Sequence, residues 1–311
     1  MRPILRLFGC CLIFAGLFDA RAYEQATHAE VFTRAAVSQS IVQTDPTVLR
    51  NLGLDKGVAD VFPNSEGRSR TIQELFEDGS RFEDSVFPTI RPFRHFYNPL
   101  NSQGLSTLIL PIQTSSPDWA LAVPDTMPGQ EFSYWNARQY LFDALTKPSK
   151  TERRNAFGRS FQALGQVMHH LQDMGQPQHV RNDIHCDNLA CVFIGGYASS
   201  LYENWTNQNR GSLPTDFSSI GYDITSPAFT STFNSPRRFW NTEPPGPNSP
   251  VTGKGIAEFT NRNFVSAGTI FFSDATGFHP NPNFALPAPG PIGERITIAK
   301  LMPGTSLTGE V

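Results

Sequence analysis

The sequence predicts a mainly α fold, in which a multi-helical domain is followed by an irregular, loop-rich C-terminal part. Apolar residues recur at helical spacing in much of residues 27–174, whereas Pro, Gly, Ser and Asn concentrate in residues 211–254 and 277–291. The 311 residues, 39% of them hydrophobic and 25 of them Phe, are enough to bury a sizeable core. We expect one helical domain over residues 23–275 and a Pro/Gly-rich tail over residues 276–311, with a candidate short strand at 294–301.

The first two helices are expected at residues 27–40 and 71–77. Thr27 and Glu30 have the spacing of a capping box, which predicts that the first helix begins at Thr27. The residues expected on its buried side are Val31, Phe32, Ala35 and Ala36. The second helix is expected to end near Gly79.

Two longer helices are expected at residues 131–146 and 151–174. The first has Pro148 just beyond its end, and its apolar anchors are Phe132, Trp135 and Leu145. The second has the clearest periodicity, because its apolar residues follow one another at spacings of four, three, four and three. These residues are Phe157, Phe161, Leu164, Met168 and Leu171. A further helix over residues 255–272 would place Ile256, Phe259, Phe264 and Ile270 near one face.

The N-terminus has the layout of a secretory signal peptide. Arg2 and Arg6 form a positive start, residues 7–18 are apolar, and Ala20-Arg21-Ala22 is a small-x-small cleavage site. The apolar run is too short to span a bilayer, so no transmembrane segment is expected. We therefore expect residues 1–22 to be removed, and the mature protein to be secreted or periplasmic with Tyr23 at its N-terminus.

Two of the four cysteines, Cys10 and Cys11, would leave with the signal peptide. Cys186 and Cys191 remain, and in an oxidising compartment their proximity favours a small loop disulfide. A zinc thiolate pair is the alternative. The formal net charge of −3 provides no basic field for a polyanion, so no stable nucleic-acid partner is expected. We expect a monomer.

A candidate metal site lies at the end of the predicted helix over residues 151–174. His169 and Asp173 are four residues apart, so on a helix their side chains share one face. Gly175 and Pro177 stop the helix, and the turn that follows can return His179 to the same place. Two imidazoles and a carboxylate suit zinc. The alternatives are an exposed His-rich helix end without metal, and His170 in place of His169, since His170 approaches Asp173 at i,i+3.

Three more segments carry residues that could reach this site, namely residues 79–84, 91–99 and 202–205. Together with the His169 motif, they give the chain a resemblance to the bacterial zinc-dependent phospholipases C. More distantly, the chain resembles the fungal single-strand-specific nucleases of the same superfamily. The similarity is concentrated in these short motifs between Tyr23 and Trp205. The resemblance implies a helical phospholipase C/nuclease-like domain that holds up to three zinc ions and hydrolyses phosphate esters.

The resemblance also implies a role for each ligand. One zinc ion would be bound by the amino group and carbonyl of Tyr23 together with His28. A second would be bound by Asp84, His95, His169 and Asp173, with Asp173 bridging to the first ion and Asp84 touching the attacking water as the catalytic carboxylate. The third would be bound by His179 and Glu203.

The chain departs from the family pattern at four positions. Tyr23 stands where the family usually has Trp, and Asn98 replaces Asp in the family's His-Phe-Tyr-Asp-Pro motif. Ser85 follows Asp84 where an aromatic residue is expected. Ser199 stands where the phospholipases have a His ligand four residues before the Glu, and His185 is the best substitute for it.

Each candidate ligand also has an interpretation without metal. His28 could be an exposed first-turn residue, Glu83 and Asp84 a solvated pair, and Glu203 ordinary helix surface. His95, which lies among aromatic residues, could be a core histidine with satisfied hydrogen bonds.

The preferred hypothesis is an exported phospholipase C-like hydrolase of a phospholipid phosphodiester. The second hypothesis is a single-strand nuclease or nucleotidase with the same metal site, whose aromatic rings stack on bases. The third is a non-catalytic metal-binding protein in which the change at Ser199 marks the loss of activity.

Overall fold

The computed structural model describes residues 25–84, 91–106, 113–186, 197–198, 200–213, 215, 226–264, 266, 271–274 and 277–280. Several predictions concern residues outside these ranges. They concern the signal peptide, Tyr23, Ser85, Cys191, Ser199 and the candidate strand at 294–301. The signal peptide, the disulfide and the metal-binding role of Tyr23 therefore stay predictions.

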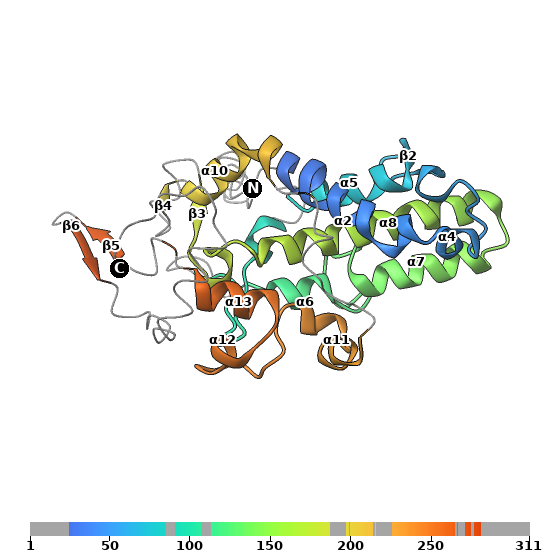
Figure 1. Cartoon of the computed structure of the whole chain (residues 1–311). Coiled ribbons are helices and arrows are strands. Elements are labelled where there is room, and N and C mark those ends of the chain that lie inside the picture. Colours follow the sequence, from blue (N-terminus) through green and yellow to red (C-terminus); the bar gives the residue numbers. More distant parts are fainter. Residues whose placement is uncertain are drawn as a thin grey trace, which may run out of the picture.

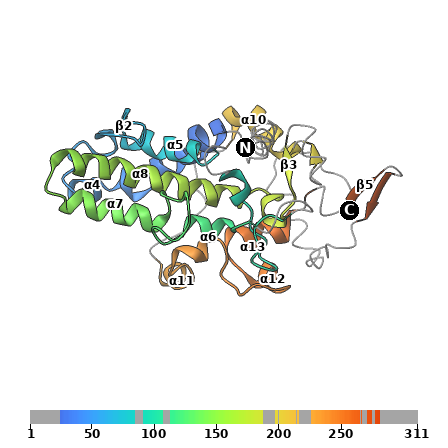
Figure 2. The same cartoon turned by 180° about the vertical axis from the view of Figure 1, so that it is seen from behind.

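The described residues form a mainly helical structure, as predicted (Figure 1). The long helix α8 (Lys150–Asp173) runs between α7 (Tyr134–Thr146), with which it forms a helical hairpin, and α5 (Ile72–Phe82). Seen from behind, α5 and α7 again lie on opposite sides of α8 (Figure 2). Both predicted long helices are thus confirmed, with ends shifted by one to three residues.

Glycine allows α5 and α8 to approach each other closely. A Cβ atom on Gly79 would lie 2.0 Å from the carbonyl oxygen of Gln162, and one on Gly165 would lie 2.1 Å from that of Phe76. Any side chain at either position would therefore push the two helices apart. The prediction that the helix ends near Gly79 was wrong: Gly79 lies inside α5, where it serves as a contact point.

The helix predicted at residues 27–40 is present as a π-helical segment, η1 (Thr27–Thr33), followed by α2 (Arg34–Gln39). The predicted capping box is not formed. Ala26 already has helical dihedral angles, no side chain caps the helix, and Thr27 is buried within it.

In the described part of the chain, two clusters of buried residues contribute to the core. The first surrounds the N-terminal halves of α5 and α8 and includes Leu49, Phe62, Ile72, Leu75, Phe76, Phe157 and Phe161. The second lies beside the C-terminal end of α8 and includes Tyr97, Val167, Met174, Val180, Trp240 and Ala257. The end of α8 is thus held between the helical bundle and the segments that follow it.

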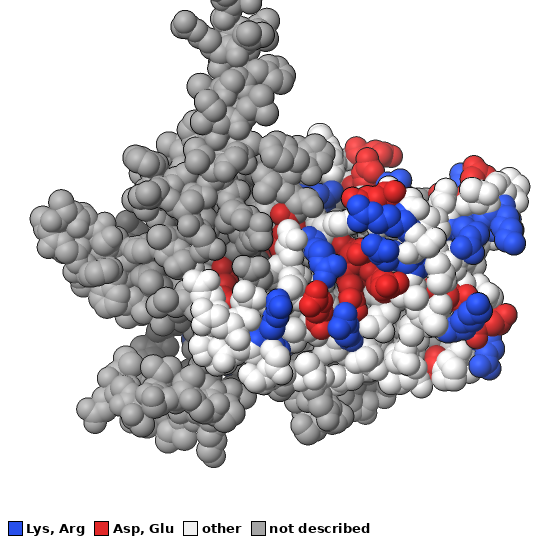
Figure 3. Space-filling model, turned by 90° about the horizontal axis from the view of Figure 1, so that it is seen from above, with Lys and Arg blue, Asp and Glu red and all other residues white. Residues whose placement is uncertain are grey.

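Short elements complete the first half of the described chain. They are α3 (Ile41–Thr44), α4 (Pro46–Arg50), η2 (Gly57–Ala59), the antiparallel strands β1 (Val61–Pro63) and β2 (Ser69–Thr71), η3 (Arg91–Arg94) and α6 (Ser116–Ala120). On the face of the molecule seen in Figure 3, basic and acidic side chains alternate. Ion pairs near α2 and α5 are Arg34–Glu77, Arg70–Asp78 and Arg81–Glu30.

The second half of the described chain begins with η4 (His179–Arg181), the parallel pair β3 (His185–Cys186) and β4 (Tyr197–Ala198), and α10 (Leu201–Gln208). Short helices then interrupt the predicted loop over residues 211–254. They are η5 (Arg210–Ser212), α11 (Pro227–Thr232), η7 (Pro236–Phe239) and α12 (Ser249–Thr252).

The helix predicted at residues 255–272 is shorter than expected. It is α13 (Ile256–Asn263), and it ends before Phe264, whose backbone is extended. Residues beyond it form the antiparallel strands β5 (Phe271–Asp274) and β6 (Gly277–Pro280), and the predicted boundary between residues 275 and 276 lies in the undescribed segment between them in the sequence. Within the described ranges, every helix is too short or too polar to cross a bilayer.

Candidate metal centre

The end of α8 places His169 and Asp173 side by side, as their spacing predicted. Both side chains are fully buried, and Nε2 of His169 lies 3.2 Å from Oδ2 of Asp173. The backbone then turns, with hydrogen bonds from Gly175 N to the carbonyl of Gln172 and from Gln176 N to that of Asp173. This turn returns His179 to the site, with its Nδ1 atom 3.9 Å from Oδ2 of Asp173.

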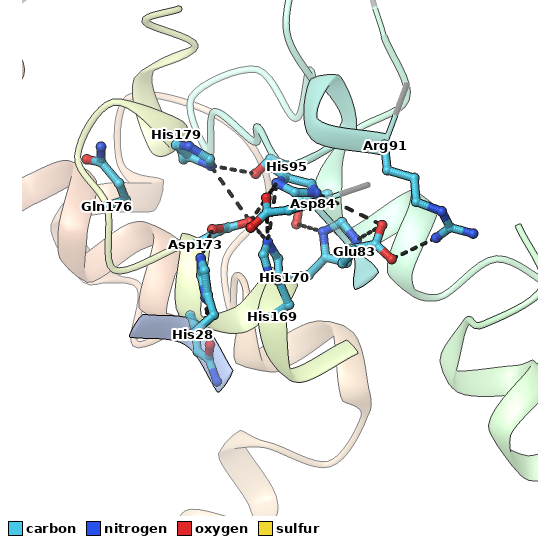
Figure 4. Close-up of polar contacts among 12 residues, drawn as sticks. His28, Glu83, Asp84, Arg91, His95, His169, His170, Asp173, Gln176 and His179 are labelled. Carbon is cyan, nitrogen blue, oxygen red and sulfur yellow. Dashed lines mark hydrogen bonds and ion pairs between the residues drawn. The ribbon is translucent and has the colours of Figure 1, made fainter. Parts of the chain in front are cut away.

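Four ligand atoms converge at the centre of the site (Figure 4). Nδ1 of His95 lies 3.2 Å from Oδ2 of Asp173 and 3.4 Å from Nε2 of His169. Oδ1 of Asp84 lies 3.7 Å from the His95 nitrogen and 3.6 Å from the His169 nitrogen. Atoms bound 2.0–2.1 Å from a tetrahedral metal ion such as zinc lie about 3.3 Å apart, so the spacings among His95, His169 and Asp173 fit one ion, with Asp84 beside the two histidines. We call this set, Asp84, His95, His169 and Asp173, the central cluster.

The members of the central cluster arrive from distant segments. Asp84 lies just beyond the C-terminal end of α5. The close contact of Gly79 with α8 fixes where this end lies along α8. His95 follows η3, where the hydrogen bond from Tyr97 N to the carbonyl of His179 ties its segment to the turn after α8. The arrangement therefore depends on packing between helices that are distant in sequence. For example, His169 of α8 contacts Ser80 of α5, which is 89 residues away in sequence.

A second group, the outer cluster, consists of His179, His185 and Glu203. Nε2 of His185 lies 2.7 Å from Oε1 of Glu203, and Nε2 of His179 lies 3.9 Å from the same oxygen. Ser200 caps α10 by accepting a hydrogen bond from Glu203 N, which fixes the position of Glu203 in the first turn. The structure thus brings His185, the predicted substitute, to the other two residues.

His28 lies on the other side of Asp173. Its Nε2 atom is 3.3 Å from Oδ1 of Asp173, whereas Oδ2 of Asp173 faces the central cluster. His28, Asp84 and His169 also form a group in which the ligand atoms are within 4.8 Å of one another. Asp173 therefore has one oxygen toward His28 and one toward His95 and His169, which is the arrangement a bridging carboxylate requires.

Hydrogen bonds to carbonyl oxygens determine which ring nitrogen is available in four of the imidazoles. Each pairs Nδ1 with a carbonyl: His28 with the side chain of Gln172 (2.7 Å), His169 with Ser80 (2.7 Å), His179 with His95 (3.3 Å) and His185 with Asp183 (3.1 Å). A carbonyl only accepts, so Nδ1 must donate and a neutral ring keeps its lone pair on Nε2. These are the Nε2 atoms that face the carboxylates. Such fixed tautomers are typical of metal-binding histidines.

Buried polar atoms at the centre lack hydrogen-bond partners within the described part of the chain. They are both carboxylate oxygens of Asp173 and the Nε2 atom of His179. Leaving a buried charged group in this state costs about 1–3 kcal/mol or more. A lone pair of His169 facing a carboxylate likewise requires a cation or a proton between them. The residues present therefore fit a bound divalent metal ion.

The charges around these groups shift their pKa values. Burial lowers the pKa of His179 to about 3, only partly opposed by Asp173. Burial also disfavours the charged form of His185, but Glu203 outweighs it and raises the pKa of His185 to about 9. For Asp173, burial acts against ionisation, yet the neighbouring histidines, His169 first, hold its pKa well below the usual range.

A hydrogen-bonded layer behind the central cluster was not predicted. It is centred on Glu83, which is fully buried. Glu83 accepts hydrogen bonds from Arg91 (2.7 Å), Trp119 (2.9 Å) and His170 (3.0 Å), and its Oε1 atom lies 4.0 Å from Nε2 of His95 (Figure 4). The guanidinium group already neutralises this carboxylate, so we assign Glu83 to the support of His95 rather than to a separate ion.

This layer also separates His169 from His170, the alternative that the sequence left open. His170 pairs with Glu83 and, through Nδ1, with Ser116 Oγ at 3.1 Å, so His169 and not His170 joins Asp173. Asp84 rather than Glu83 enters the central cluster. In the sequence, only the adjacency of Glu83 to Asp84 and the position of Arg91 in the His95 segment pointed to this layer, and Trp119 belongs to none of the motif segments.

The burial of these side chains disagrees with the interpretations that involve no metal. His28, Glu83, Asp84 and Glu203 are buried, so they are neither an exposed helix end nor a solvated pair. His95 lies in the core, but its Nε2 atom has no hydrogen-bond partner in the described residues, so it is not a satisfied core histidine.

Neither models of protein families, nor curated protein sequences, nor solved structures show a match to this chain. The fold and the site define the class of this protein: it is a mainly helical protein with buried His/Asp/Glu clusters that could hold metal ions.

Proposed function

We propose that this protein is an exported, zinc-dependent phosphoric diester hydrolase, phospholipase C-like in its substrate. The observation that carries the proposal is the position of Asp173 between His28 on one side and His95 and His169 on the other. One carboxylate shared by adjacent ligand sets indicates a polynuclear centre. In hydrolases, such centres are typical of phosphoryl chemistry.

Zinc, when bound, would supply Lewis acidity and lower the pKa of a bound water toward about 7. Asp84, His95, His169 and Asp173 would hold one ion, and His179, His185 and Glu203 another. His28 and Asp173, with the terminal amine of Tyr23, would hold a third. The six buried imidazoles, including His170 in the supporting layer, and the apolar rings beside them, such as Phe96 stacked on His179 at 4.4 Å, exclude bulk water from the ligands.

Asp84 is the candidate catalytic carboxylate. It is buried at the end of α5 and faces the rings of His95 and His169, so its oxygens are at the position where a nucleophilic water would be oriented. A carboxylate there can accept the proton that the water loses as it attacks phosphorus. Glu83 cannot take this role, because Arg91, Trp119 and His170 already hold it.

A phospholipid is the preferred substrate because the His95-Phe-Tyr-Asn-Pro99 segment is closer to the phospholipase motif than to the nuclease one. The net charge of −3 also gives no electrostatic attraction for a nucleic acid strand.

Three measurements on the purified mature protein test the proposal. Zinc content is determined first, and turnover is then measured on phosphatidylcholine and on single-stranded DNA. Hydrolysis of the lipid to diacylglycerol, lost on chelation and restored by zinc, is the expected result. Cleavage of DNA alone would instead support the nuclease, and bound zinc without turnover of either substrate or of a generic phosphodiester would support a non-catalytic metal protein.

A further inference from the structure

Helix α7 packs small residues against α8 and exposes several of its large apolar side chains. Against α8 it buries small residues, Ala137 and Ala144, and Ser160 of α8 donates a hydrogen bond to the carbonyl of Ala137 at 2.9 Å. Three of its large apolar side chains are exposed, Trp135 by 39%, Phe142 by 61% and Leu145 by 52%, whereas Leu141 packs against the first core cluster. The prediction that Trp135 and Leu145 anchor this helix in the core was therefore wrong.

These side chains form one continuous surface. Residues 135, 138, 142 and 145 follow the i, i+3, i+7, i+10 spacing of one helix face. Val123, 58% exposed, lies beside them, and a shallow groove of about 520 Å³ is lined by Val123, Pro124, Trp135, Arg138, Gln139 and Phe142. We call Val123, Trp135, Arg138, Phe142 and Leu145 the α7 face. Contiguous large apolar residues on a surface usually mark an interaction site.

The residues of α7 and those that directly follow it carry more positive than negative charge. Between residues 135 and 153 the basic residues are Arg138, Lys147, Lys150 and Arg153, whereas the acidic ones are Asp143 and Glu152. Arg138 lies over the Trp135 ring, with 5.0 Å between its Cζ atom and the ring centroid. Trp, Phe and Leu on one face with Lys and Arg at its border is the composition of helices that lie in a membrane interface.

We propose that the α7 face docks the protein on an anionic lipid membrane. Positive charge at the border complements anionic head groups, whereas in a symmetric dimer the same cations would face each other. The α7 hairpin forms one edge of the molecule in both views (Figures 1 and 2). From Ser160, which contacts α7, to His169, α8 rises by about 14 Å, so docking through this face leaves the metal centre uncovered. The proposal deepens the proposed function, on which it rests, by naming the surface through which a lipid hydrolase meets its substrate.

Vesicle binding of the full mature chain tests the proposal. Sedimentation is measured with vesicles of phosphatidylcholine alone and of phosphatidylcholine mixed with an equal share of phosphatidylglycerol, in an Asp84→Asn background so that lipid is not consumed. We expect binding to the anionic vesicles that weakens with salt. Phe142→Ser with Leu145→Ser should reduce the partition coefficient on the order of tenfold or more. Lys147→Glu with Lys150→Glu should abolish the preference for anionic vesicles.

The matched control is Val251→Ser, which removes a comparably exposed apolar residue, 48% exposed, from α12 and should leave binding unchanged. Unchanged melting temperatures show that the variants fold. Absence of vesicle binding, or equal binding by the Phe142/Leu145 variant, would overturn the proposal. So would a concentration-dependent dimer that this variant dissociates, because a second copy would then cover the face. Turnover of a soluble phosphodiester by the protein with Asp84 intact reports separately on the hydrolase, so the two proposals can fail independently.

Discussion

The Nε2 atom of His185 lies 2.7 Å from Oε1 of Glu203, although 18 residues separate them in sequence. His179 approaches the same oxygen at 3.9 Å. His185, the predicted substitute for a ligand at position 199, thus lies with His179 and Glu203, and the outer cluster has three donor residues.

His185→Ala should therefore remove one metal ion from the protein. Loss of one of three donors should weaken metal binding at this cluster by at least about ten- to a hundredfold, the effect typical of removing even an outer partner. Zinc content after dialysis measures it. His279→Ala, a histidine to which the sequence assigns no metal-binding role, is the control. Full zinc occupancy in His185→Ala would show that another group binds there.

Asp173→Asn should have the largest effect on turnover. The substitution preserves size but removes the charge that lies between His28 and His169, so binding at two neighbouring positions should weaken together. We expect activity to fall at least about a hundredfold and zinc content to drop by more than one ion. Asp125→Asn changes an exposed aspartate and should alter neither quantity. An Asp173→Asn protein with near-normal turnover would rule out the bridging role.

Glu83→Gln should destabilise the protein far more than Glu131→Gln, although both glutamates have an arginine partner at 2.7 Å. Glu83 is fully buried with Arg91, whereas the Glu131 side chain is 66% exposed beside Arg159. Breaking a buried pair costs about 3–5 kcal/mol, because a charge is left uncompensated. Breaking an exposed pair costs about 0–1 kcal/mol.

Urea unfolding, with and without zinc, measures both glutamate variants. If Glu83 also orients His95, zinc affinity should fall in Glu83→Gln and remain unchanged in Glu131→Gln. Equal losses of stability in the two variants would contradict the assignment of Glu83 to a supporting layer.

Zinc binding to the outer cluster should release a proton from His185. With a pKa of about 9 in the metal-free protein, this ring is protonated at pH 7, and the metal must displace the proton from it. His179, with a pKa of about 3, is already neutral and releases none. Affinity at this cluster should therefore rise as the pH increases from 7 toward 9. Titration calorimetry in buffers of different ionisation enthalpy counts the protons, and His185→Gln should release fewer than the native chain.

Local sequence was sufficient for the parts of the site that lie within one element. The i,i+4 spacing of His169 and Asp173, followed by Gly175 and Pro177, predicted a helix end with two ligands and a turn that returns His179. The structure brings these residues together in that way, because helical geometry fixes which side chains share a face. The periodicity of residues 151–174 predicted α8 itself.

Packing between elements decided the rest. Whether Gly79 ends a helix or lets it touch another depends on the backbone of Gln162 opposite it, which no local pattern contains. The same contact decides that Asp84 faces His95 while Glu83 faces Arg91. Likewise, periodicity placed Trp135 and Leu145 on one helix face, but only the position of α8 shows that this face is exposed. Side-chain spacing is a property of a single element, whereas burial and metal coordination depend on neighbours that are distant in sequence.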